Sequence, residues 1–339
     1  MRKKTTIIAE VGQAHEGSLG IAHSYIDALS NTGIDVVKFQ THIADSESGQ
    51  EEPFRIKFSY EDKTRYDYWR RMEFSLEQWI GLKKHCDDLN LEFMSTPSCL
   101  AAVDLLEQVG VKRYKIGSGD LTNKLLIKKI ADTKKPIILS AGMSTMEDIH
   151  CTFEYLNKLN LNYSLLHCTS QYPMNPENGK MSLINEYKSK FSCPIGYSDH
   201  SGTIFPSIAA TTLGAEIIEF HVVFDKNMFG HDSTSSITIK EAYELVKGIR
   251  CVEKLFTEKG QKDIDGSMND MKNIFEKSLA VNKDLKKGHC IVFDDLESKK
   301  PSGFGVSVID FEKVIGGRLN KDIKKYEFLN YEDIINEHS

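Results

Sequence analysis

The segment IIAEVG at residues 7–12 shows the pattern that decides the fold: a short run of β-branched and other apolar residues, then a loop, then a helical stretch. The pattern recurs in VVKFQ (36–40), EFMSTP (92–97), RYKIGS (113–118), PIILS (136–140), YSLLHC (163–168), PIGYSDH (194–200) and IIEFHVV (217–223). Such runs are typical of parallel strands that are buried on both faces. Eight of them, alternating with helices inside roughly 250 residues, predict a (β/α)₈ TIM barrel.

An open, doubly wound sheet is the competing architecture for alternating strands and helices. It would require a glycine-rich dinucleotide loop after the first strand, but AEVGQAHEGSLG (9–20) lacks the GxGxxG spacing. The barrel is therefore the predicted fold. Several of its helices have starts with the spacing of a capping box: Ser75 with Gln78, Ser144 with Glu147, and Thr238 with Glu241.

The chain divides into two predicted domains. The barrel pattern ends with a helix at about residue 256, so residues 1–256 are the predicted barrel, and the polar residues 257–273 are the predicted linker. Residues 274–339 contain short β-like pieces and turns, which predict a small β-rich module. Within the barrel, the connection from Thr41 to Phe74 is rich in Tyr and Trp, and a long insertion after a strand is more often functional than not.

Composition narrows the class of protein. Among 339 residues, 40% are apolar and 27% charged, which is typical of a folded globular chain. The formal net charge of −6 gives no sign of nucleic-acid binding. The start, MRKKTTIIAEVG, is expected to be neither a signal peptide nor a membrane span. Seven scattered cysteines without CxxC spacing predict reduced thiols and a cytoplasmic location.

Polar side chains stand at the carboxyl end of nearly every predicted strand, where barrel enzymes of this type carry their active sites. A Ser or Thr there most often only caps a turn or helix. A lysine inside an apolar strand is different, because lysine is almost never buried without a partner. Lys38 and Lys115 are two such lysines. Together with nearby hydroxyls and the Gly117–Gly119 backbone, they would suit a ligand with a phosphate and a carboxylate. The residues concerned are Glu10, Lys38, Gln40, Thr96, Lys115, Ser118, Ser140, Ser170, Tyr172, Ser198, His200 and His221, with Asp232 beyond.

His200 and His221 end the seventh and eighth strands, which are neighbours in a closed barrel. They could share a metal ion, or each could be a hydrogen-bonded core histidine, which the residues alone favour. His167 and His231 are alternative ligands. Two protein ligands would leave coordination positions open, as catalytic metal sites do. No GxSxG, P-loop, HExxH or kinase signature occurs. A glycosidase-type reaction that uses the two acids at this mouth, Glu10 and Asp232, stays open as an alternative.

Taken together, the motifs resemble those of the sialic acid (N-acetylneuraminate) synthase family, which includes legionaminic and pseudaminic acid synthases. The segments that carry the resemblance follow one another in the family's order: IIAEVGQAHEGSL, VVKFQTH, STP, YKIGSGD, PIILSAGMST, LLHCTSQYP and GYSDHSG. The C-terminal module, with SLAVNKDLKKG and DDLESKKPSGFG, resembles the SAF (antifreeze-like) domain of these enzymes. The resemblance covers nearly the whole chain, and the combination of motifs is highly specific.

The resemblance implies an enzyme that condenses phosphoenolpyruvate with an open-chain amino-sugar aldehyde and water, giving a nine-carbon 2-keto acid and phosphate. It implies a divalent metal, typically Mn²⁺ with Mg²⁺ or Co²⁺ as alternatives, on His200 and His221. Glu10 matches a family glutamate near the reacting carbons. The phosphoenolpyruvate-binding residues match Lys38, Thr96, Lys115, Ser118, Ser140 and Ser198, and the sugar-binding residues match Gln40, Tyr172 and Asp232.

This chain departs from the family pattern at three places. Ser170 stands where the best-known members have Asn, so that the side chain at one contact to phosphoenolpyruvate is shorter. Lys300 replaces an arginine thought to reach the sugar's N-acyl group from a partner subunit, and lysine cannot reproduce the planar guanidinium fork. His231 replaces a proline. The resemblance also implies a domain-swapped homodimer, in which Lys300 reaches the site of the partner.

The resemblance leaves the acceptor open between N-acetylmannosamine and a 2,4-diacetamido-2,4,6-trideoxy-hexose. A synthase for other 3-deoxy sugar acids is the alternative within enzymology, and the SAF-like module argues against it. A non-catalytic carbohydrate-binding protein is the alternative from another class, but an inert barrel would not need polar residues at nearly every strand end. Metal-dependent hydrolysis would release phosphate without a sugar.

Overall fold

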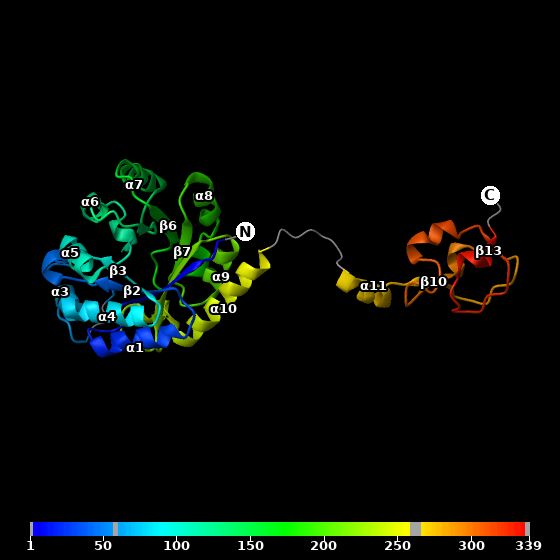
Figure 1. Ribbon diagram of the computed structural model, residues 1–339, viewed down its shortest axis with the longest axis horizontal. Helices are drawn as coiled ribbons and strands as arrows, with labels where there is room; N and C mark the ends of the chain where they lie inside the picture. Colours follow the sequence, from blue (N-terminus) through cyan, green and yellow to red (C-terminus); the bar gives the residue numbers. More distant parts are fainter. Residues whose placement is uncertain (1–2, 57–59, 258–265, 336–339) are drawn as a thin grey trace. The chain divides into compact units, whose positions relative to one another are not determined.

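The computed structural model describes residues 3–56, 60–257 and 266–335, which form two compact units, Met1–Glu258 and Lys259–Ser339. In the first unit, eight parallel strands follow one another in sequence order, and β1 pairs with β8 to close the barrel (Figure 1). The predicted TIM barrel is confirmed. Its strands are β1 (Thr6–Gly12), β2 (Val36–Thr41), β3 (Glu92–Pro97), β4 (Tyr114–Ile116), β5 (Ile137–Ser140), β6 (Tyr163–Cys168), β7 (Ile195–Asp199) and β8 (Ile217–Val223).

Helices surround these strands, and a short strand, β9 (Ile237–Thr238), pairs with β8 before the last helix. The barrel helices are α1 (Leu19–Ser30), α4 (Leu76–Asp88), α5 (Leu100–Val109), α6 (Lys124–Ala131), α7 (Met146–Lys158), α8 (Ser182–Lys190), α9 (Phe205–Thr212) and α10 (Ile239–Leu255). Each buries one face, and in α1 the buried residues are Ala22, Tyr25, Ile26 and Leu29. That spacing is the apolar stripe that an amphipathic helix lays on a sheet.

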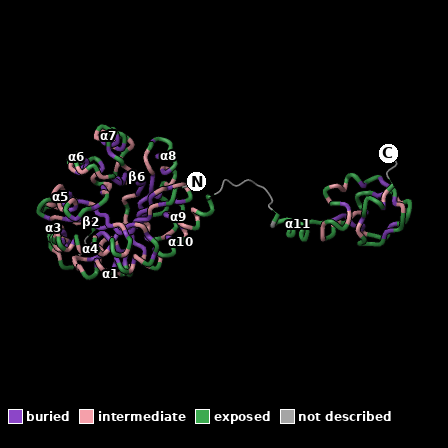
Figure 2. Tube along the Cα trace, in the orientation of Figure 1, coloured by how far each residue is buried: buried purple, intermediate pink, exposed green. Residues whose placement is uncertain are grey.

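Two apolar layers hold the barrel together. The larger one lies between the helices and the outer face of the strands, and the smaller one fills the barrel interior. The strands of the barrel are accordingly mostly buried (Figure 2, purple). The interior layer takes one side chain from each of six strands: Ile8, Val36, Met94, Ile138, Leu166 and Ile217. The barrel is therefore a packed core, and a ligand has room only at its ends.

Two of the three predicted capping boxes are confirmed, those of Ser75 with Gln78 and of Thr238 with Glu241. The third is wrong by one residue, because α7 is capped by Thr145 with Asp148. The amide of Ser144 is already used in a turn, where it donates to the carbonyl of Ala141 at 3.1 Å. The backbone is extended at Thr145, which is the conformation that an N-cap needs.

The connection between β2 and α4 carries α2 (Ala44–Glu47) and α3 (Arg65–Met72). These helices have a small core of their own, made of Ala44, Tyr68, Trp69 and Met72. The capping box of Thr64 with Asp67 starts α3. This connection is therefore a folded element beside the barrel.

The second unit is small and antiparallel. Strands β10 (Ser278–Val281) and β11 (Leu296–Lys299) form one sheet, and β12 (Arg318–Leu319) and β13 (Ile334–Ile335) form another. This agrees with the predicted β-rich module. Part of the predicted linker, residues 258–265, lies outside the described residues. Another part folds as α11 (Asn269–Phe275), which the linker prediction did not include.

No helix in the described part of the chain is long and apolar enough to cross a membrane. All seven cysteines are free thiols, as predicted.

His15, in the loop after β1, makes the stability of the fold depend on pH. Its ring packs on Phe74 at 4.7 Å between ring centroids, and only 1% of the residue is exposed. Burial lowers the pKa of His15 to about 3. Between pH 6.5 and 3 the ring of His15 therefore holds a proton in the unfolded chain but not in the folded protein. As the pH falls through this window, the contribution of His15 to stability decreases by up to about 1.4 kcal/mol per pH unit.

We expect His15→Gln to flatten this dependence, because glutamine takes up no proton in that window. The measurement is the melting temperature between pH 7 and 4, with the exposed His150→Gln as the matched control. His150→Gln should lose stability with falling pH as steeply as the parent protein. An equally steep loss in His15→Gln would contradict the prediction.

Candidate active site

A cavity of about 490 Å³ opens at the carboxyl ends of the barrel strands. Glu219, Cys168 and Met143 contribute to its wall without having been predicted. It brings together eleven of the predicted site residues: Glu10, Lys38, Gln40, Thr96, Lys115, Ser118, Ser140, Tyr172, Ser198, His200 and His221. Side chains spread over more than two hundred positions of sequence thus line one space.

The strand register explains this convergence. Glu10 of β1 lies opposite Lys38 of β2 on one side and opposite His221 of β8 on the other. Alternate residues of a strand share a face, so Gln40 follows Lys38 into the cavity. For the same reason Glu219 accompanies His221, two residues further along β8.

Four buried charges form a network at the bottom of the cavity. The ammonium of Lys38 lies 2.5 Å from a carboxylate oxygen of Glu10 and 3.7 Å from one of Glu219. The ammonium of Lys115 lies 3.6 Å from the other oxygen of Glu219. Glu219 therefore serves as the shared counter-charge of both lysines. Sequence reasoning missed it, although an acid inside the apolar run IIEFHVV, two residues before a predicted ligand, was a usable signal.

Burial and the charges of the network shift the pKa values of its members in different directions. Burial raises the pKa of Glu10, against the opposing effect of Lys38. Burial would also raise the pKa of Glu219, but Lys115 and Lys38 outweigh it and lower that pKa to about 2. Burial lowers the pKa of Lys115, whereas the two carboxylates outweigh burial at Lys38 and raise its pKa. Glu10 is thus the carboxyl of the cluster that takes up a proton most readily.

Hydroxyl groups complete the surroundings of the lysines. Lys115 Nζ donates to Ser140 Oγ at 2.7 Å, and Lys38 Nζ lies 3.3 Å from Thr96 Oγ1. Ser198 Oγ donates to Glu219 Oε1 at 2.9 Å. Donors of this kind around two ammonium groups make a site that suits an anion.

Three predicted residues do not line this cavity: Ser170, Lys300 and Asp232. Ser170 does not line the cavity, but its Oγ is 3.1 Å from Ser118 Oγ, which does. Lys300 belongs to the second unit, where its Nζ lies 4.7 Å from the ring centroid of Phe275.

His200 and His221 lie side by side, with ring centroids 5.5 Å apart. His200 Nδ1 lies 3.0 Å from the carbonyl oxygen of Thr169, so that Nδ1 carries the proton and Nε2 keeps its lone pair. Burial lowers the pKa of His200 to about 4 and also lowers that of His221. Two neutral imidazoles, one oriented by a backbone carbonyl, have the chemistry of metal ligands.

The donor set fits a metal site with open positions. Among the described residues, no group of three or more His, Cys, Asp or Glu side chains is placed to hold a metal. A metal on the two histidines would therefore take its other ligands from water or substrate, as catalytic ions do. Of the alternative ligands, His167 does not line the cavity and binds the carbonyl of Gly179 at 2.8 Å.

Asp232 lies next to the histidines, 3.9 Å from His221 Nδ1 and 3.1 Å from His231 Nε2. Arg55, which was not predicted, donates to its other oxygen at 2.8 Å. Burial would raise the pKa of Asp232, but these neighbours outweigh it and hold that pKa well below its usual range. Asp232 is therefore a permanent carboxylate at the edge of the cavity.

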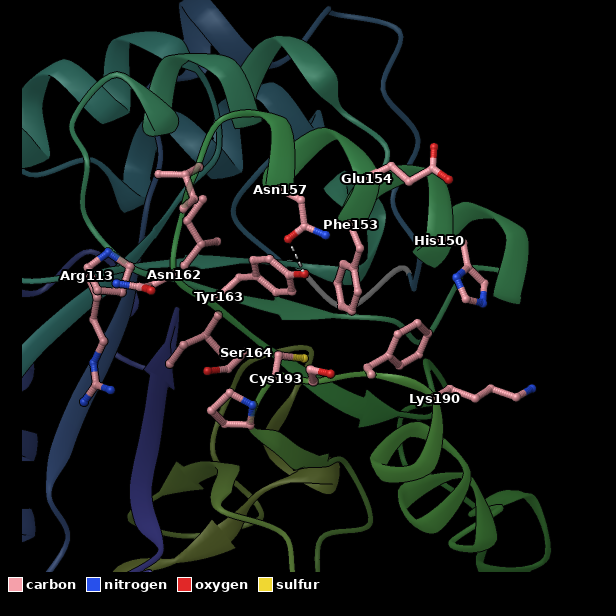
Figure 3. Close-up of a pocket in the computed structure, with 17 residues that line it drawn as sticks. Arg113, His150, Phe153, Glu154, Asn157, Asn162, Tyr163, Ser164, Lys190 and Cys193 are labelled. Carbon is pink, nitrogen blue, oxygen red and sulfur yellow. Dashed lines mark hydrogen bonds between the residues drawn. The ribbon is translucent and has the colours of Figure 1, made fainter.

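A separate cavity of about 700 Å³ lies at the opposite ends of the strands, where β5, β6 and β7 begin. Figure 3 shows Tyr163 donating to Asn157, at 2.9 Å, beside the ring of Phe153. None of the predicted site residues lines it. Active sites of this fold lie at the carboxyl ends of the strands, so its larger volume does not make it the catalytic site.

Glu219→Gln would leave two buried ammonium groups with only one carboxylate. Removing one partner of a buried ion pair typically costs about 3–5 kcal/mol, so we expect the melting temperature to fall by several degrees. Inorganic phosphate should then raise the melting temperature of Glu219→Gln more than that of the parent protein, because the anion replaces the lost charge. Glu216→Gln, which removes a half-buried carboxylate from a surface pair, is the matched control. An equal response of all three proteins to phosphate would count against the shared counter-charge.

Comparisons with known proteins show which family this chain belongs to. A model of the NeuB family matches residues 25–261. N,N'-diacetyllegionaminic acid synthase of Campylobacter jejuni is 36% identical over 96% of this chain and 99% of its own length. N-acetylneuraminate-9-phosphate synthase of Homo sapiens is 30% identical over 98% of this chain and 93% of its own length. The structure of a sialic acid synthetase from Leptospira borgpetersenii, in complex with citrate, matches at 31% identity with a TM-score of 0.70, covering 79% of this chain and 90% of that one. The chain therefore belongs to the NeuB family of nonulosonic acid synthases.

Proposed function

We propose that this protein condenses phosphoenolpyruvate with the open-chain aldehyde of an N-acetylated amino sugar and with water. The products are a nine-carbon 2-keto acid and inorganic phosphate. One observation carries the proposal: two buried lysines, a buried glutamate and two neutral histidines line one cavity. The relatives named as legionaminic acid and N-acetylneuraminate-9-phosphate synthases support it.

Phosphoenolpyruvate carries a phosphate and a carboxylate, and the cavity offers two cations within a ring of hydroxyls. Lys38 and Lys115 are proposed to hold these anionic groups, together with Thr96, Ser118, Ser140 and Ser198. The lysines are held by Glu10, Glu219 and Ser140 before any ligand enters. Such preorganised charge orients the substrate without further rearrangement.

In the proposed reaction, C3 of phosphoenolpyruvate attacks the aldehyde carbon, and the aldehyde oxygen takes up a proton. The oxygen of water adds to C2 and one of its protons leaves, which makes C2 tetrahedral with a hydroxyl group. The bond from C2 to the phosphate oxygen then breaks, the hydroxyl gives up its proton, and C2 becomes the ketone as phosphate departs. Glu10 is proposed to move these protons, since burial raises its pKa and so favours reversible protonation. Asp232, Gln40 and Tyr172 are proposed to bind and orient the sugar.

His200 and His221 would hold a divalent cation, Mn²⁺ in this proposal with Mg²⁺ or Co²⁺ as alternatives. When bound, the ion would supply Lewis-acid polarisation of the aldehyde oxygen. The chain's own part is to keep both imidazoles neutral, through burial, and to keep His200 oriented through the carbonyl of Thr169.

We further propose that the protein works in the cytoplasm as a homodimer in which the second unit of one subunit closes the site of its partner. Lys300 would then approach the partner's acceptor, and Ser170 would support the phosphoenolpyruvate site through Ser118. The acceptor is N-acetylmannosamine or a 2,4-diacetamido-2,4,6-trideoxy-hexose in this proposal.

The test of the proposed function is phosphate release from phosphoenolpyruvate with Mn²⁺ present. It is run with N-acetylmannosamine, with 2,4-diacetamido-2,4,6-trideoxy-mannose and with no sugar. Release that depends on one sugar, with one 2-keto acid formed per phosphate, is the expected result and names the acceptor. Release without sugar would indicate a hydrolase, and no release with any sugar would overturn the proposal.

His221→Ala should lower metal-dependent turnover at least about 100-fold, because one of the two protein ligands is lost. Mn²⁺ binding, followed by the loss of the free-ion electron paramagnetic resonance signal, should weaken in parallel. His167→Gln is the matched control, because His167 is a buried histidine of β6 that lies outside the cavity. Undiminished Mn²⁺ binding in His221→Ala would remove His221 from the metal site.

A further inference from the structure

A smaller cavity of about 190 Å³ adjoins the predicted site, and both are lined by Gln40, Arg65, Trp69, Tyr172 and His221. Its outer wall comes from the connection between β2 and α4, which supplies Phe54, Arg55, Ile56, Arg65, Tyr68 and Trp69. The connection is a folded element with its own small core, so this wall has a defined position on the barrel. A ligand at the histidines would extend directly into this space.

Arg55 is fixed at the edge of this cavity by two contacts. Its Nη2 donates to Asp232 Oδ1 at 2.8 Å, and its guanidinium carbon lies 4.2 Å from the ring centroid of Tyr172. Both partners border the histidines, since Tyr172 Oη is 3.2 Å from His200 Nε2 and Asp232 is 3.9 Å from His221 Nδ1. A planar guanidinium held by an ion pair and by stacking keeps its remaining N–H groups in a defined orientation.

These remaining groups are available to a ligand. Within residues 3–56, 60–257 and 266–335, the Nε and Nη1 atoms of Arg55 donate no hydrogen bond, while Nη2 uses Asp232 and the more distant carbonyl of His231 at 3.5 Å. Arg55 can therefore add hydrogen bonds to a bound molecule without giving up its ion pair.

The charges of the cavity are already compensated. Arg55 is paired with Asp232 at 2.8 Å, and Arg65 is paired with Glu52 at 3.1 Å. The N–H groups of Arg55 that its ion pair leaves unused can donate to an uncharged carbonyl oxygen, which needs no further counter-charge. Phe54 and Trp69 line the same small space and offer an apolar surface. A hydrogen-bond donor beside an apolar wall is what the carbonyl oxygen and the methyl group of an acetamido substituent require.

We propose that Arg55 is a specificity-determining residue of the acceptor subsite, where it donates to the acetamido carbonyl oxygen of the sugar while the methyl group packs on Phe54 and Trp69. This inference rests on the proposed function. It places the recognition of the N-acyl group on the barrel's own insertion.

The test compares two sugars on each protein: the N-acetylated acceptor that the parent protein uses, and its analogue with a hydroxyl in place of that acetamido group. The preference is the ratio of the kcat/KM values of the two sugars. Where the analogue turns over too slowly for kcat/KM to be measured, its competitive inhibition constant is used instead. We expect Arg55→Ala and Arg55→Gln each to lower the preference for the acetamido sugar at least about 10-fold, since a hydrogen bond from a charged donor to the carbonyl oxygen is lost. The KM for phosphoenolpyruvate should stay within about twofold of the parent value, because Arg55 does not line the cavity that holds the lysines.

The preference is a ratio measured on one preparation, so it does not depend on the fraction of each variant that is folded. Arg70→Ala is the matched control, because Arg70 is an arginine of the same insertion that pairs with Asp45 and lines neither cavity. It should keep the parent preference. Unchanged preference in both Arg55 variants, with the parent protein active, would overturn this inference and leave the proposed function intact. An inactive parent protein would overturn both.

Discussion

The site depends on the burial of two ammonium groups and two carboxylates at one end of a packed barrel. Burying one such charge alone would cost several kcal/mol, so each lysine has to have a carboxylate within reach. Glu10 and Glu219 meet this requirement from neighbouring strands, and Glu219 is shared by both lysines. The ammonium groups already have partners before any anion enters, and fixed positions of charge are what a preorganised anion site needs.

The mouth of the barrel combines two kinds of structure. The lysines, the histidines and Glu10 stand on or directly after strands, whose positions are set by the barrel register. Arg55, Tyr68 and Trp69 stand on an insertion that has its own small core. An insertion of this kind can change without disturbing the barrel interior, so it is a suitable place for the recognition of one sugar rather than another.

Much of the site could be predicted from the sequence, since eleven predicted residues line one cavity. Lysines inside apolar strands need a counter-charge, and polar residues at the ends of parallel strands must meet at one edge of the barrel. Glu219 was missed although it lies two residues before His221 in the same strand, and alternate residues of a strand share a face. Ser170 lies behind the wall and supports Ser118, and the described second unit holds Lys300.

The sequence by itself determined the order of strands and helices, the closed barrel and most of the polar residues at its mouth, because these follow from local periodicity and from motifs within short segments. Only the tertiary structure decided which of these groups form ion pairs with one another. Arg55 and Asp232 are 177 positions apart, and Lys115 meets Glu219 across the barrel. Such contacts depend on the register of strands and on the path of an insertion, and neither leaves a local pattern in the chain.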